Sequence, residues 1–91
     1  MLDKLTWNKE KNEKLIKERN ISFEEIEKAI VNGNLLDIIP HRNQNKYPNQ
    51  MIYIVKINNY IFEVPFIMNE KEIFLKTIFK SRKATKKYIK S

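Results

Sequence analysis

The sequence has no cysteine and a single histidine, His41, among its 91 residues. Without cysteine the chain cannot form disulfides, thiolate nucleophiles or cysteine-based zinc sites. A catalytic zinc ion takes several His, carboxylate or Cys ligands in concert, and one histidine argues against such a site. We therefore expect no metal and no cofactor.

Long apolar runs are also missing. No apolar run approaches the roughly 18 residues that a membrane span needs, and the N-terminal MLDKLTW lacks the apolar region of a secretory signal. The sequence therefore predicts a cytoplasmic protein with no membrane partner. Because the hydrophobic content is an ordinary 42%, we expect one folded domain over residues 1–91.

Acidic residues are missing from one end of the chain, residues 73–91. Residues 1–72 contain eleven Lys and Arg and all eleven Asp and Glu, so the net charge of +7 belongs to the C-terminal segment. Such segregation predicts a polyanion partner, although a Lys-, Asn- and Ile-rich composition would also give a merely solvated basic helix. The seven cations are Lys76, Lys80, Arg82, Lys83, Lys86, Lys87 and Lys90.

This basic segment has a readable local pattern. Residues 73–80 alternate with a period of two, which predicts a strand, and Ser81 has the side chain of a helix N-cap. Arg82 and Lys83 then fall in the first helical turn, where the helix dipole disfavours cations and a bound phosphate would reverse that cost. We predict a phosphate site at this strand-to-helix corner. Four residues share the apolar helix face: Ala84, Thr85, Tyr88 and Ile89.

Local signals also divide the first half of the chain. Residues 5–7 suit a short edge strand, and the charged helix formers from Asn8 to about residue 19 predict a helix. Ser22 and Glu25 have the spacing of a capping box, which predicts a second helix. Gly33, the only glycine, is the natural left-handed C-cap of that helix.

The second half predicts a sheet. Residues 35–39, 51–57 and 60–66 have strand composition, and Asn58-Asn59 suits a two-residue hairpin turn with positive φ. Pro65 fits best near the end of its strand. Two helices, then an antiparallel meander of three or four strands, then a basic helix give an α+β class with the helices packed on one sheet face.

Three stretches carry a resemblance to a known family: WNKEKN at residues 7–12, ISFEE at residues 21–25 and SRKAT at residues 81–85. Together with Tyr88, they resemble the BrnT family of toxins from bacterial type II toxin–antitoxin pairs. The resemblance covers nearly the whole chain, and RKAT is its most specific part. It implies a RelE-like ribonuclease fold, metal-independent RNA cleavage that arrests translation, and neutralisation by a cognate antitoxin.

The chain departs from the family pattern in places. Residues 18–20 are Glu-Arg-Asn where members commonly carry Lys-His-Gly, so no role of that histidine is carried over. The resemblance places the family's strand arginine on Lys76, after a one-residue shift, and its basic corner on Arg82. The loop with His41 and Tyr47 has no close counterpart, which indicates a divergent branch.

Metal-free RNA cleavage needs a group that takes the 2′-hydroxyl proton, positive charge for the developing phosphorane, and an acid for the leaving 5′-oxygen. We expect Arg82 and Lys76 to supply the charge. The candidates for proton transfer are His41, Tyr47, Tyr53, Tyr88 or a lysine. His41 is favoured among them because its ordinary pKa lies near neutrality, although an exposed loop histidine without a role fits its position equally well. The predicted catalytic residues are His41, Lys76 and Arg82.

Five further residues are predicted to contact RNA. Lys80, Lys83 and Lys86 would bind phosphates. Tyr47 and Tyr53 would stack on bases, although aromatic residues on strands are more often packing residues.

The leading hypothesis is thus an endoribonuclease toxin, an mRNA interferase, with RNA as substrate and an antitoxin as partner. A second hypothesis is a non-catalytic RNA-binding or partner-binding module with the same fold. A DNA-binding antitoxin is the weaker third, because the pattern contains no helix-turn-helix and no ribbon-type arm.

Overall fold

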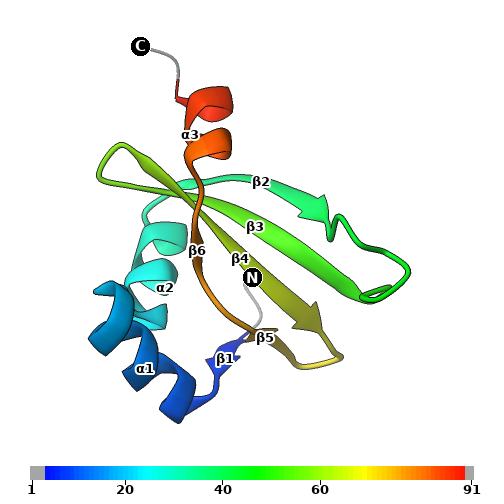
Figure 1. Ribbon diagram of the computed structural model, residues 1–91. Coiled ribbons are helices and arrows are strands. Elements are labelled where there is room, and N and C mark those ends of the chain that lie inside the picture. The colour runs from blue at the N-terminus through cyan, green and yellow to red at the C-terminus, as the bar shows by residue number, and fades with distance from the viewer. Residues whose placement is uncertain (1–3, 90–91) are drawn as a thin grey trace.

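A computed structural model describes residues 4–89 and confirms the α+β class. Figure 1 shows the arrangement of its helices and strands. In chain order they are β1 (Lys4–Trp7), α1 (Lys9–Arg19), α2 (Phe23–Val31), β2 (Leu35–Pro40), β3 (Gln50–Ile57), β4 (Tyr60–Met68), β5 (Glu72–Leu75), β6 (Phe79–Lys80) and α3 (Arg82–Tyr88).

The sheet is larger than the predicted three or four antiparallel strands. It has six strands in the order β1-β5-β4-β3-β2, with β6 also paired to β4. The edge strand β1 runs parallel to β5, and the other pairs are antiparallel. The short β1 segment gives no local sign of its distant partner, which explains why the sequence did not predict the parallel pair.

The single strand predicted over residues 73–80 is wrong, since β5 and β6 are separate. β5 pairs with Phe66–Met68 of β4 and β6 pairs with Phe62 and Glu63, so the break lies beside Pro65. The carbonyl of Pro65 accepts a 2.8 Å hydrogen bond from the backbone N–H of Lys76. Pro65 has no N–H to return on that side, so the ladder cannot continue past it. Pro65 itself lies inside β4 rather than near its end.

Local caps form where the sequence predicts them. The Ser22 hydroxyl accepts a 3.1 Å hydrogen bond from the backbone N–H of Glu25 and donates to the Glu25 carboxylate. Gly33 follows α2 with φ +85°, and the hairpin residues Asn58 and Asn59 have φ values of 52° and 63°. These three signals are therefore confirmed.

The helices cover both faces of the sheet, not one face as predicted. Tyr53 and Val55 of β3 pack in the larger core with α1 and α2. Ile52 and Ile54, which alternate with them, pack in a second core with Ala84 of α3. In Figure 1, α1 and α2 lie together on one side of the sheet and α3 lies apart from them. Because β3 is apolar on both faces, each face needs its own cover.

No helix within residues 4–89 is long and apolar enough to cross a membrane. Within the same residues, no group of three or more His, Cys, Asp or Glu side chains could hold a metal ion.

Candidate nucleic-acid interface

The basic helix α3 is anchored firmly to β4. The Ser81 backbone N–H donates to the carbonyl of Ile61 at 2.9 Å, and the Ile61 N–H donates to the Thr85 hydroxyl at 2.9 Å. The Ser81 hydroxyl accepts from the backbone N–H of Ala84 at 3.0 Å, as expected of an N-cap. These bonds fix the start of the helix over the sheet.

A pocket of about 350 Å³ opens between α3, β4 and the end of β2. Its charged lining consists of Arg42, Glu63, Lys83 and Lys87. Its apolar lining comes from Ile39, Ile54 and Ala84, and the hydroxyl-bearing residues Ser81 and Tyr88 complete it. The pocket thus combines cations with an apolar floor.

Arg42 and Glu63 form a bidentate ion pair in this pocket. The two guanidinium nitrogens of Arg42 lie 2.7 and 2.9 Å from the two carboxylate oxygens of Glu63. The Glu63 side chain is 10% exposed and that of Arg42 is 62% exposed. The hydrogen bonds from Arg42 lower the pKa of Glu63 against the opposing effect of burial, and they raise the pKa of Arg42. Glu63 is therefore ionised at neutral pH and holds Arg42 in one orientation.

Tyr88 ties the end of α3 to the edge strand β2. Its hydroxyl donates a 2.7 Å hydrogen bond to Oδ2 of Asp37. This bond, together with one from the backbone N–H of Ile38, lowers the pKa of Asp37. The same contact raises the pKa of Tyr88. Tyr88 is thereby held beside the pocket.

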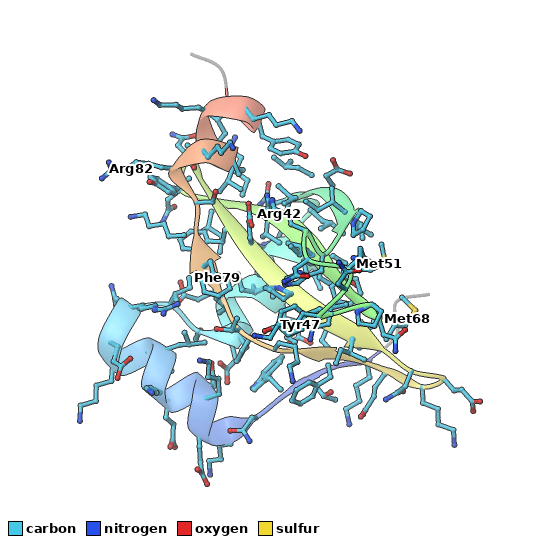
Figure 2. All side chains as sticks on the ribbon, turned by 45° about the vertical axis from the view of Figure 1, so that its right-hand side comes forward. Arg42, Tyr47, Met51, Met68, Phe79 and Arg82 are labelled. Carbon is cyan, nitrogen blue, oxygen red and sulfur yellow. The ribbon has the colours of Figure 1, made fainter. Side chains whose placement is uncertain are left out.

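The cations of the basic segment that lie within residues 4–89 form no ion pair with a carboxylate within 4.0 Å. Arg42–Glu63 is the single ion pair within 4.0 Å among residues 4–89. On α3, Lys83 and Lys87 stand on the flank that lines the pocket, whereas Arg82 and Lys86 are exposed and do not line it. Figure 2 shows Arg82 and Arg42 on different sides of α3. Lys90, the seventh cation of the predicted segment, lies outside the described residues.

Comparison with protein families gives one match, described as "Domain of unknown function (DUF4258)", over residues 13–80. The chain belongs to the DUF4258 family. No curated protein and no solved structure matches it. The matched segment contains the Arg42–Glu63 pair and ends just before α3, so the lysines of α3 lie beyond the DUF4258 match.

The DUF4258 fold does not gather the three predicted catalytic residues. His41 packs against Tyr47, with ring centroids 4.5 Å apart, and Lys76 places its Nζ 5.5 Å from the ring centroid of Phe74. Arg82 is exposed on the flank of α3 that does not line the pocket. Across residues 4–89, no hydrogen bond, ion pair or ring contact joins any two of His41, Lys76 and Arg82.

The hydrogen bond at His41 decides its neutral tautomer. Its Nδ1 accepts a 3.1 Å hydrogen bond from the backbone N–H of Asn43, so neutral His41 carries its proton on Nε2. Nε2 is then a donor, not a base. The 2′-hydroxyl role therefore requires a change of tautomer, whereas a hydrogen bond from Nε2 to a phosphate oxygen does not.

The predicted RNA-contacting residues are divided between surface and core. Lys80 places its Nζ 4.3 Å from the ring centroid of Tyr60, and Lys86 is exposed on α3. Tyr47 is half-buried against His41. Tyr53 is 6% exposed and stacked on Phe66 at 3.9 Å, so it packs in the core and offers no face to a base.

Sequence reasoning missed Arg42, Glu63 and Lys87 as pocket residues. One signal was available for Glu63, because it is the only charged residue in the apolar strand Tyr60–Met68. A carboxylate inside such a strand needs a paired cation. Nothing local identified Arg42 as that cation, because 21 positions separate the two residues.

Proposed function

We propose that this DUF4258 protein is the toxin of a bacterial type II toxin–antitoxin pair and acts in the cytoplasm. Its activity would be metal-independent cleavage of RNA, which inhibits translation. The RelE-like fold and the BrnT resemblance belong to this proposal, and the α+β architecture with its basic terminal helix supports them.

The observation that carries the proposal is the set of unneutralised cations around α3. Lys83 and Lys87 line a pocket beside Arg42, and no carboxylate other than Glu63 pairs with a cation within residues 4–89. A cation without a carboxylate partner is free to bind phosphate, and such contacts supply most of the affinity of a protein for RNA. An RNA strand is therefore a suitable partner for this surface.

The chemistry of cleavage would draw on residues around that surface. The positive charge of Lys76 and Arg82 would stabilise the phosphorane that forms when the 2′-hydroxyl attacks the adjacent phosphate. His41 would take the 2′-hydroxyl proton at Nε2 after a change to the tautomer that carries hydrogen on Nδ1, and the imidazolium so formed would give a proton to the leaving 5′-oxygen. These assignments require the RNA strand to bridge residues that do not touch one another in the free protein.

A protein partner would have an edge strand available. β2 is the last strand of the sheet, and its Leu36 and Ile38 are 41% and 46% exposed. An unpaired edge with exposed apolar side chains is a site where another chain can add a strand or pack. We propose this edge as the surface that the cognate antitoxin covers.

The separation of His41, Lys76 and Arg82 favours a second candidate function. A module that binds RNA without cutting it needs the cations but not a gathered catalytic group. Such a protein would bind RNA with a steep salt dependence and leave it intact.

Induction in a bacterial host tests the choice between these functions. We expect the wild type to arrest growth with cleavage of total RNA, and the double variant Lys76→Ala/Arg82→Ala to lose both effects. The matched control Lys14→Ala/Lys17→Ala removes two exposed charges from α1 and should stay toxic. Retained toxicity in a well-expressed Lys76→Ala/Arg82→Ala variant would contradict the catalytic assignment. Intact RNA without arrest in the wild type would favour the binding module.

A further inference from the structure

The pocket beside α3 has an excess of positive charge. Three cations, Arg42, Lys83 and Lys87, and one carboxylate, Glu63, line it. Asp37, which Tyr88 holds beside the pocket, interacts electrostatically with Lys87, so one positive charge remains in excess. Lys83 and Lys87 are four residues apart on one flank of α3, so both side chains reach the same opening. Like charges held this close repel one another, and a bound anion would relieve that repulsion.

Arg42 is pre-oriented for a second acceptor. A guanidinium has five N–H donors, and Arg42 uses two of them on Glu63, which leaves three. Its side chain is 62% exposed, so these donors are accessible from outside. Because Glu63 already fixes the orientation of the guanidinium, a phosphate would bind with little further loss of side-chain freedom.

The floor of the pocket suits more than a bare anion. Ile54 is fully buried and Ile39 is half-buried beneath the opening. The ring of Tyr88, held by Asp37, forms part of the wall. An apolar floor next to a cationic rim matches a nucleotide, which has a charged phosphate at one end and a flat, weakly polar base at the other.

We propose that this pocket holds one nucleotide of a single-stranded RNA, its phosphate on Arg42, Lys83 and Lys87 and its base against Ile39 and Tyr88. The inference rests on the proposed function. It places the RNA substrate on the flank of α3 that lines the pocket. It assigns binding to residues other than the predicted Lys80, Lys86 and Tyr53.

Fluorescence anisotropy with the full chain and a short, labelled single-stranded RNA tests this assignment. We expect Lys83→Ala/Lys87→Ala to weaken binding about tenfold or more. It should also lower the slope of log affinity against log salt by about 1.4, as for two lost phosphate contacts on a single strand. The matched control, Lys14→Ala/Lys17→Ala, removes the same charge from α1 and should change affinity less than about twofold. Equal losses in the two variants would overturn the pocket.

Competition separates a nucleotide from a bare phosphate. Adenosine monophosphate should displace the RNA at concentrations where inorganic phosphate does not, and it should shift the methyl NMR signals of Ile39. If inorganic phosphate competes equally and the methyl signals stay unchanged, the pocket takes an anion only and the nucleotide assignment is wrong.

The binding measurement is independent of cleavage. If the wild type cuts RNA and the Lys83→Ala/Lys87→Ala variant binds and cuts equally well, the proposed function stands and this inference fails. If the pocket binds the nucleotide but the RNA stays intact, the inference stands and the proposed cleavage fails.

Discussion

Replacement of Arg42 by alanine is the sharpest test of the pocket's internal structure. The change leaves the Glu63 carboxylate, whose side chain is 10% exposed, without its two hydrogen bonds. Removing one partner of a buried pair costs about 3–5 kcal/mol, but the exposure of Arg42 places this pair partly in solvent. We therefore expect a loss of about 1–3 kcal/mol in the free energy of unfolding at neutral pH.

The loss should depend on pH. In the wild type the pKa of Glu63 is lowered, chiefly by the hydrogen bonds from Arg42. The pair therefore stabilises the fold above the unfolded-state pKa of about 4.3, and this contribution is lost as pH falls through the folded-state pKa. In the variant the hydrogen bonds from Arg42 are gone, so burial raises the pKa of Glu63. As the pH falls, Glu63 is therefore protonated at a higher pH in the variant than in the wild type, and the cost of its unpaired charge disappears. The difference between the two proteins should shrink as the pH is lowered to about 4.

Urea denaturation at pH 7 and pH 4, followed by Trp7 fluorescence, measures both effects. Trp7 is the only tryptophan and stacks on Phe23 at 5.6 Å, so it reports on the main core. The double variant Arg42→Ala/Glu63→Gln removes the unpaired charge and should recover part of the lost stability. Wild-type stability of Arg42→Ala at pH 7, or a deficit of equal size at both pH values, would refute this reasoning.

Two further predictions concern a turn and a tether. Gly33→Ala should destabilise the fold by about 1–2 kcal/mol in the same urea assay, because φ is +85° there and the added Cβ meets no atom within 4 Å, so the cost is confined to the backbone. A variant as stable as the wild type would contradict this. Tyr88→Phe should raise the pKa of Asp37 toward its ordinary value, since the Tyr88 hydroxyl is the main cause of its lowering. Carboxyl NMR titration measures that pKa, with Tyr60→Phe as the control, and an unchanged Asp37 titration would rule out the tether.

The parts of the fold that the sequence predicted are those decided within a few residues. The Ser22 cap, the left-handed Gly33 and the Asn58-Asn59 turn each depend on one or two residues and their immediate backbone, and all three are confirmed. The same holds for Ser81, which caps α3 as predicted. Local geometry leaves these positions few alternatives.

The parts that the sequence did not predict depend on distant partners. The break between β5 and β6 is set by Pro65 on the neighbouring strand, which the alternation of residues 73–80 cannot reveal. The parallel pairing of β1 with β5 joins residues 68 positions apart, such as Lys4 and Glu72. Neither feature leaves a periodic pattern in its own segment.

The candidate site follows the same division. The excess of cations near α3 was visible in the sequence, but their separation into a pocket flank and an outer flank required the position of α3 on β4. The helical period divides these cations into two flanks, Lys83 with Lys87 and Arg82 with Lys86. It does not tell which of the two flanks lines the pocket. For Tyr53, the composition of the strand allowed two roles, stacking on an RNA base or packing in the protein core. Its burial in the structure shows that it packs in the core.

Incubation of the purified full chain with labelled single-stranded RNA in the presence of a metal chelator tests the central claim most directly. The proposed function predicts RNA fragments that accumulate with time and no effect of the chelator, since the 2′-hydroxyl of the RNA is the nucleophile. RNA that stays intact at an excess of folded protein, with folding checked by Trp7 fluorescence, would contradict metal-independent cleavage and leave RNA binding as the function to pursue.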